Sequence, residues 1–146
     1  MKVKDIMCSN PIVLGIDSSL FDIANVMKKY DIGFIPICNN HKIVGILTDR
    51  DIVTRIIANN DDKIDGYLTV DLITIDFDSD IKDALDIMTK HKVKRLLVVE
   101  NNKFKGIISL SDILSTNIDI INNIKEIFAI DKNDDTYITK IDEFEL

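Results

Sequence analysis

The sequence is poor in the residues that mark disulfide-rich, metal-binding and membrane proteins. It has two cysteines in 146 residues, Cys8 and Cys38, with no CxxC spacing and no histidine pair nearby. Neither a disulfide framework nor a zinc site is therefore indicated. The longest apolar runs, such as residues 96–99 and 106–108, are far shorter than the roughly 20 residues that cross a bilayer. We expect no membrane span, no signal peptide, no membrane partner and a cytoplasmic location.

An excess of basic residues is also missing. The formal net charge is −7, and after residue 118 eight acidic residues face three lysines, a net of −5 that leaves −2 for residues 1–118. A domain that binds nucleic acid ordinarily carries a basic face or stripe, and none is obvious, so we expect no nucleic acid as partner. The hydrophobic content of 46% is enough for a full core.

What the sequence does contain is an internal repeat. When it is shifted by 61 positions, residues 3–57 (the first copy) fall on residues 64–118 (the second copy) without a gap. The closest match pairs residues 42–53, KIVGILTDRDIV, with residues 103–114, KFKGIISLSDIL. The same register pairs Ile12 with Ile73, Asp22 with Asp83 and Met27 with Met88. A fixed internal period indicates one structural unit used twice.

Each copy reads as strand, helix, strand, strand, helix. Ser19 and Asp80 are suitable N-caps for the first helices, whose apolar stripes at i, i+3, i+4 and i+7 include Met27 and Met88. Asparagine-rich turns predict a hairpin in each copy. The strands are expected at residues 12–16, 34–38 and 43–47, and at residues 73–77, 96–99 and 104–108. The closing helices are expected at residues 49–58 and 111–116.

This pattern predicts the α/β (α+β) class. A unit of about 55 residues buries only a thin core, so we expect the two units to pack sheet to sheet as one pseudo-symmetric module with a crevice between them. The expected domains are residues 1–60 and 61–118, followed by a C-terminal helix and acidic tail over residues 119–146. That helix carries an apolar stripe, which packs either on its own module or on a partner.

The pattern Gly-hydrophobic-hydrophobic-Thr/Ser-x-x-Asp, which opens a helix after a hairpin, resembles the CBS (cystathionine β-synthase) domain. It occurs twice in register, and the resemblance covers residues 3–118. Residues 106–114, GIISLSDIL, are also similar to the nucleotide-binding motif in the regulatory subunit of AMP-activated protein kinase. The resemblance implies a tandem CBS pair (Bateman module) that requires no cofactor, catalyses nothing and binds AMP, ADP or ATP between its units. It also implies a homodimer, which would regulate a protein that the sequence does not identify.

Four polar residues are the first candidates for contact with a nucleotide. Asp51 and Asp112, in the first turns of the closing helices, could each accept two hydrogen bonds from a ribose 2′,3′-diol. Thr48 and Ser109 stand at the helix entrances, where a hydroxyl and free N–H groups suit a phosphate oxygen. The alternative, that these four residues only cap their helices, stays open.

The candidate site also needs cations for the phosphate and apolar side chains for the base. Arg50 lies between the candidates of the first copy, whereas the second copy has Ser111 there. The resemblance to the kinase subunit implies that Lys94 and Arg95 reach phosphate and that Ser111 assists. The first copy has the uncharged pair Gly33-Phe34 in that place, so Lys94 or Arg95 is a candidate to serve a ligand across the crevice. The base is expected to lie against Ile12, Val13, Phe34, Ile35, Pro36, Ile73, Thr74, Leu96 and Leu97.

Other functions also fit the pattern. The clefts could hold another adenosyl ligand, such as S-adenosylmethionine or NAD, or they could be vestigial in a module that serves dimerisation. A nucleotide hydrolase is the remaining class, but the sequence shows no acid–base pair, metal cluster or P-loop that would support it.

Overall fold

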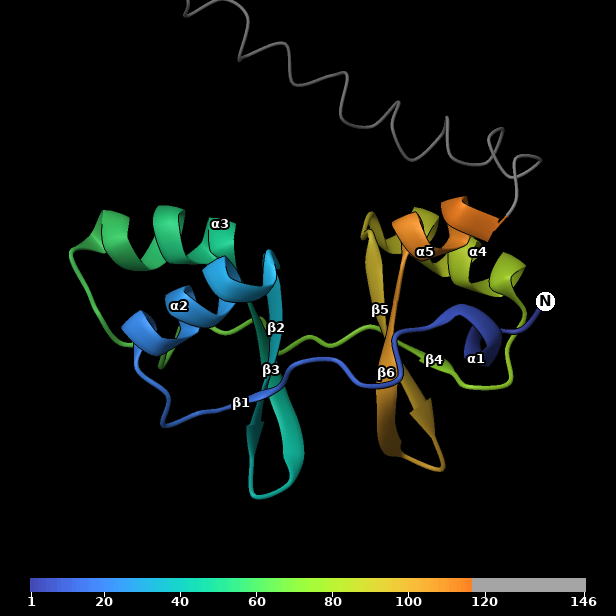
Figure 1. The fold of residues 1–146 in the computed structure, drawn as a ribbon, viewed down its shortest axis with the longest axis horizontal. Helices are drawn as coiled ribbons and strands as arrows, with labels where there is room; N and C mark the ends of the chain where they lie inside the picture. Colours follow the sequence, from blue (N-terminus) through green and yellow to red (C-terminus); the bar gives the residue numbers. More distant parts are fainter. Residues whose placement is uncertain (117–146) are drawn as a thin grey trace, which may run out of the picture.

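The computed structural model describes residues 1–116, which form two similar units side by side (Figure 1). The first unit contains β1 (Leu14–Gly15), α2 (Leu20–Tyr30), β2 (Phe34–Asn39), β3 (Lys42–Thr48), α3 (Asp49–Asp51), η1 (Ile52–Ile56) and η2 (Ile57–Asn59). The second contains β4 (Thr74–Asp76), α4 (Ile81–His91), β5 (Arg95–Glu100), β6 (Lys103–Ser109) and α5 (Leu110–Thr116). A short helix, α1 (Val3–Ile6), precedes both. The α/β class is confirmed, and the predicted C-terminal helix and acidic tail lie outside the described residues.

Each unit has a three-stranded sheet of the same topology. The strand orders are β1-β2-β3 and β4-β5-β6, with a parallel first pair and an antiparallel hairpin. Even the register irregularity recurs, between Ile37 and Cys38 in the first sheet and between Val98 and Val99 in the second. Figure 1 shows the hairpin turns at one end of the pair and the longer helices toward the other.

The hairpin turns follow from their asparagines. Asn40 and His41 have φ of 48° and 63°, and Asn101 and Asn102 have φ of 50° and 60°. A two-residue hairpin turn with both φ values positive matches the twist of the strands, and asparagine tolerates this conformation better than most residues. The predicted turns are confirmed.

The first helix of each copy begins where its cap predicts. Ser19 accepts a hydrogen bond from the Asp22 N–H, and the Asp80 N–H donates to Asp83. The methionine of each stripe is buried, Met27 in the core of the first unit and Met88 in that of the second. Capping and the apolar stripe therefore place α2 and α4 on their sheets.

The closing helix of the first copy differs from the regular helix predicted for residues 49–58. It begins as one α-helical turn, continues as the π-helix η1 and ends as the 3₁₀-helix η2, at Asn60 with φ of 58°. Its counterpart α5 is α-helical throughout the described residues. The π-helical turn widens the helix just after the Thr48-x-x-Asp51 motif, so the two copies diverge next to their candidate ligand residues.

The first strand of each copy is shorter than predicted, and the reason is the path of the chain before it. Residues 8–13 cross from the second unit to the first, and residues 69–73 cross in the opposite direction (Figure 1). Cys8 exchanges two backbone hydrogen bonds with Ile107, and Thr69 exchanges two with Ile46. Residues 12, 13 and 73 therefore belong to crossing segments rather than to the sheets.

The crossing also exchanges parts of the two cores. Val3 is fully buried in the core of the second unit, whereas Ile64 is buried in the core of the first. Lys2 forms an ion pair of 3.0 Å with Asp80, at the start of α4. The linear division at residue 60 remains a prediction for domain boundaries, but packing joins the start of each copy to the other unit.

Glycine at two equivalent positions allows this crossing. A Cβ at Gly45 would lie 2.8 Å from the Cβ of Leu68, and one at Gly106 would overlap the carbonyl oxygen of Cys8. The close approach of the crossing segments therefore requires glycine at both positions.

Candidate ligand-binding cleft

The four polar candidates form two reciprocal caps. The Thr48 N–H and hydroxyl donate to Asp51 Oδ2 at 3.2 and 2.8 Å, and the Asp51 N–H donates back to the hydroxyl at 3.1 Å. The Ser109 N–H and hydroxyl donate to Asp112 Oδ2 at 2.8 and 2.6 Å, with a return bond of 3.2 Å. The capping interpretation is therefore correct for this arrangement, and it uses one oxygen of each carboxylate.

The other carboxylate oxygen distinguishes the two copies. Asp51 Oδ1 forms an ion pair of 3.4 Å with Nη1 of Arg55, one helical turn further along. The residue equivalent to Arg55 in the second copy is Thr116, whose hydroxyl donates to the carbonyl of Ile113. Within residues 1–116, Asp112 Oδ1 accepts no hydrogen bond and forms no ion pair. The second copy thus has an open acceptor where the first has a paired one.

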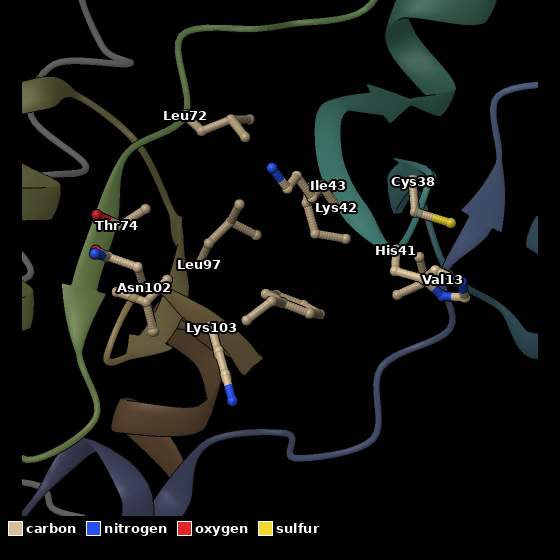
Figure 2. A pocket seen from close by; sticks show the side chains of 12 residues that line it. Val13, Cys38, His41, Lys42, Ile43, Leu72, Thr74, Leu97, Asn102 and Lys103 are labelled. Atoms are coloured by element: carbon tan, nitrogen blue, oxygen red, sulfur yellow. The ribbon is translucent and has the colours of Figure 1, made fainter.

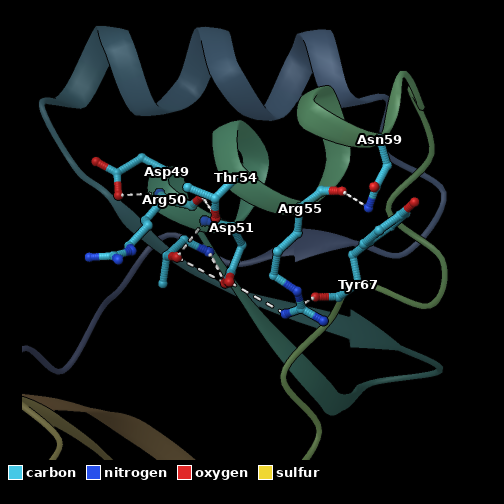
Figure 3. Close-up of polar contacts among 8 residues, drawn as sticks. Asp49, Arg50, Asp51, Thr54, Arg55, Asn59 and Tyr67 are labelled. Carbon is cyan, nitrogen blue, oxygen red and sulfur yellow. Dashed lines mark hydrogen bonds and ion pairs between the residues drawn. The ribbon is translucent and has the colours of Figure 1, made fainter.

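A polar network holds Arg55 in this position. Figure 3 shows its guanidinium between Asp51 and Tyr67, and Nη1 also donates to the Tyr67 carbonyl at 3.1 Å. The Tyr67 hydroxyl donates to Asp61 at 3.0 Å, which raises the pKa of Tyr67 above its ordinary value. The N–H groups of Lys63 and Asp62 and then the Tyr67 hydroxyl lower the pKa of Asp61. Arg55 is therefore bonded to the leading segment of the second copy.

The motif of the second copy opens into a cleft of about 460 Å³. Ser109, Asp112 and Ile107 line it from the second copy, and residues of the first copy complete it. These are the crossing residues Cys8, Asn10, Pro11 and Ile12, together with Tyr30, Asp31, Ile32, Gly33 and Phe34 at the junction of α2 and β2. The cleft therefore combines an acidic acceptor with apolar and aromatic side chains from the other unit.

Among residues 1–116, one cation lines this cleft. Arg95 lines it, and its guanidinium carbon lies 5.3 Å from the centroid of the Phe34 ring. The two residues occupy equivalent positions of the repeat, and each is the strand neighbour of its own motif, Arg95 opposite Ser109 and Phe34 opposite Thr48. Arg95 thus reaches across to the first unit, in a contact of the cation–π type.

The structure corrects part of the expected apolar wall. Ile35 and Leu96 are 0% and 1% exposed in the cores of their own units, and Pro36 is buried as well. Because successive strand residues point to opposite faces, the side chains of Ile35 and Leu96 face their helices rather than the crevice. Ile73 packs against the second core. These four side chains do not line the cleft.

The remaining candidates lie elsewhere. Val13, Thr74 and Leu97 line a different cavity at the hairpin end. Arg50, Lys94 and Ser111 are exposed and do not line the cleft. The Lys94 carbonyl accepts the Leu110 N–H at 2.9 Å, which anchors the start of α5.

Several lining residues were not predicted because the crossing was not predicted. Cys8, Asn10 and Pro11 reach the cleft only because the chain passes over Gly106 before it enters its own sheet. Arg55 was also missed, although its spacing of four residues after Asp51 on a helix was a readable signal. A comparison of position 55 with position 116 would have revealed this difference between the copies.

Residues 1–116 show neither of two other classes of site. No cluster of three or more His, Cys, Asp or Glu side chains is placed to hold a metal ion in this part of the chain. Among the helices of the same residues, none has the length and apolar character needed to cross a bilayer.

Comparison with known proteins gives a consistent family match. The family model of the CBS domain matches residues 3–58 and again residues 61–119. Inosine-5′-monophosphate dehydrogenase of Bacillus subtilis is 39% identical over 110 residues, which are 72% of this chain and 22% of the dehydrogenase. The chain therefore spans about a fifth of that enzyme. The uncharacterized protein YlbB of the same organism is 32% identical over 117 residues, covering 77% of this chain and 79% of YlbB.

A solved structure shares the fold. The CBS domain pair of protein MJ0100, in complex with 5′-methylthioadenosine and S-adenosyl-L-methionine, superposes with a TM-score of 0.72 at 29% identity. The match covers 79% of this chain and 94% of that one.

Proposed function

We propose that this chain, which belongs to the CBS domain family, is a non-catalytic regulatory module that binds an adenine nucleotide in the cleft of its second copy. The observation that carries the proposal is the open oxygen of Asp112, at a cleft that also contains a cation and an aromatic ring. AMP, ADP and ATP all present the groups that this arrangement suits.

Each part of the nucleotide has a counterpart in the cleft. Asp112 Oδ1 suits the ribose diol, because a carboxylate accepts charge-assisted hydrogen bonds from adjacent hydroxyls. Arg95 suits a phosphate, since its guanidinium donates in a fork that matches phosphate oxygens. Phe34, Tyr30 and Ile12 line the cleft with surface for a flat apolar base. The adenosyl ligands bound by the MJ0100 pair support the nucleoside part of the proposal.

We further propose that the second copy binds the first equivalent of ligand. The equivalent acceptor in the first copy is paired with Arg55 at 3.4 Å, so a diol there has to displace a guanidinium. The side chains of Arg55 and Asp51 are 44% and 18% exposed, which makes the pair a weak barrier rather than a permanent block.

The signal would pass through the contact between the units. Arg95 lies on Phe34 of the other unit, and a phosphate that recruits the guanidinium competes with that contact. A ligand shifts a conformational equilibrium only by its differential affinity for the two states. The Arg95–Phe34 contact supplies such a difference in affinity, because it is present in one state and lost in the other. An unidentified regulated protein or a dimer partner would respond to the resulting change in conformation.

The decisive experiment is isothermal titration of the full chain and two matched variants with AMP, ADP and ATP. Asp112→Asn keeps an oxygen for the Ser109 cap but removes the charged acceptor, so affinity should fall by roughly tenfold to a hundredfold. Asp51→Asn makes the same change in the first copy and should leave the first equivalent unchanged.

The outcomes separate the alternatives. If S-adenosylmethionine or NAD binds and AMP, ADP and ATP do not, the ligand of the cleft is another adenosyl compound and the nucleotide proposal is wrong. Absence of binding for all five compounds would support a structural dimerisation module. Turnover of a bound nucleotide that Asp112→Asn abolishes would make the protein an enzyme and contradict its non-catalytic role.

We also propose that two chains associate through their helices. Phe21, Val53 and Ile57 are 75%, 60% and 57% exposed on α2, η1 and η2. Apolar side chains gathered on neighbouring elements commonly mark an interface. Light scattering should give twice the chain mass for the full chain, and Val53→Asp should shift it toward one chain; a monomeric wild-type protein would refute the proposal.

A further inference from the structure

A second and larger cavity, of about 870 Å³, lies at the hairpin end of the molecule. Figure 2 shows side chains of both units facing one another across it. They are Val13, Cys38, His41, Lys42, Ile43, Leu72, Thr74, Leu97, Val99, Asn102, Lys103 and Phe104. The cleft of Asp112 lies at the end of the strands that is next to the helices, whereas this cavity lies at the end with the hairpin turns. The two are therefore separate.

The two lysines of the cavity occupy equivalent positions in the repeat. Lys42 and Lys103 each begin the second strand of a hairpin. In Figure 2 the Lys42 ammonium projects into the space between the units, whereas the Lys103 side chain points down the view, away from that ammonium. A ligand between the units can therefore meet Lys42 directly, with Lys103 at the edge of the same cavity.

Among residues 1–116, these lysines have no acidic counterpart in the cavity. No Asp or Glu of this part of the chain lines it, although the full sequence has 25 acidic residues and a net charge of −7. Within residues 1–116, Lys42 and Lys103 form no ion pair, whereas the nearby Lys105 is paired with Glu100 at 2.8 Å. The cavity is thus locally basic in an acidic protein and complements an anion.

The rest of the lining is mostly apolar. Leu97 is 3% exposed, and Leu72, Ile43 and Phe104 are half-buried around the same space. A concave apolar surface with a few polar groups at its edge is the usual form of a small-molecule site, and its volume lies in the range of such sites. The described lining residues include no carboxylate to accept a ribose diol, so their chemistry differs from that of the Asp112 cleft.

We propose that the hairpin-end cavity binds an amphipathic monoanion, a carboxylate on an apolar chain. The carboxylate binds Lys42, with Lys103 as a second cation at the edge of the cavity, and the chain packs against Leu97, Leu72 and Phe104. Such a ligand would join the two hairpins, one from each copy. This inference is independent of the nucleotide proposal, because it uses none of the residues of the Asp112 cleft.

The test is calorimetric titration of the full chain with decanoate, kept well below the concentrations at which decanoate self-associates. We expect one decanoate site per chain, and saturating AMP should leave its affinity unchanged. Butyrate should bind at least tenfold more weakly, because it loses several methylene groups of apolar contact.

A charge-matched pair of variants identifies the site. Lys42→Gln/Lys103→Gln should weaken decanoate binding about tenfold, since charge-assisted hydrogen bonds to the carboxylate are lost. Lys82→Gln/Lys90→Gln removes two exposed lysines of α4 and should leave it unchanged. The inference is overturned by no decanoate binding, by equal losses in both double variants, by displacement with AMP, or by decanoate binding that follows a change in oligomeric state instead of Lys42 and Lys103.

Discussion

Replacing Arg55 with threonine, the residue of the second copy at this position, should open the acceptor of the first copy. The change removes the 3.4 Å ion pair with Asp51 and the 3.1 Å hydrogen bond to the Tyr67 carbonyl. Asp51 would then have one oxygen in its cap and one free, as Asp112 has. The cap itself, made by Thr48, does not involve Arg55.

The expected changes in affinity and stability follow from the solvent exposure of the Arg55–Asp51 ion pair. Ion pairs as accessible as Arg55 and Asp51, 44% and 18% exposed, contribute about 0.2–1 kcal/mol. Removing this competitor should therefore tighten ligand binding at the first copy by up to about fivefold. The same loss, with one backbone hydrogen bond, should lower the free energy of unfolding by about 1–2 kcal/mol.

The assay is titration with AMP to concentrations that saturate a weak second site, fitted for two affinities. Wild type should show one tight and one weak equivalent, and Arg55→Thr should tighten only the weak one. Lys28→Gln is the control, because it removes an exposed positive charge from α2 of the same unit and is not a candidate ligand residue. Two equal sites in wild type, or an unchanged weak site in Arg55→Thr, would refute the reasoning.

The structure supports three further predictions. Gly106→Ala forces a Cβ against the Cys8 carbonyl and should cost about 1–3 kcal/mol in urea unfolding; an unchanged midpoint would mean that the crossing segment is misplaced. Phe34→Leu removes an aromatic side chain that lines the cleft as surface for the base, a loss that should exceed the gain from releasing Arg95 and weaken nucleotide binding about two- to fivefold in titrations; equal affinity would exclude a role for the aromatic face. Asp61 has a folded pKa below 3.8, so its contribution is present above the unfolded pKa and is lost as pH falls through the folded value. Thermal melts from pH 6 to 2 should therefore show a smaller acid loss for Asp61→Asn, and identical slopes would contradict this.

The elements that local chemistry determines were predictable from the sequence. The hairpins were found from Asn40 and Asn101, the helix starts from Ser19 and Asp80, and the core positions from the methionine stripes. Each depends on contacts within a few residues, and the 61-residue repeat provided two independent readings of the same unit.

The site was predictable only in part, because it depends on contacts between the copies. Asp112, Ser109 and Arg95 were found from the repeat and the family resemblance, and they line one cleft. The crossing of residues 8–13 has no local signature apart from Gly106, so Cys8 and Asn10 could not be placed. The pairing of Asp51 with Arg55 had a helical spacing, but spacing alone does not determine whether two side chains meet.

The exchange of leading segments bears on how such a pair could arise. In a protein with one copy, the segment before the sheet would find its groove only on a second molecule, because Cys8 pairs with the other unit and so does Thr69. A lone ancestral unit with the same pairing would therefore have been a domain-swapped homodimer. Gene duplication then joins the two chains through residues 58–63, and the joined copies become free to differ. The difference between Arg55 and Thr116 at equivalent positions is one that a symmetric dimer of identical chains cannot have.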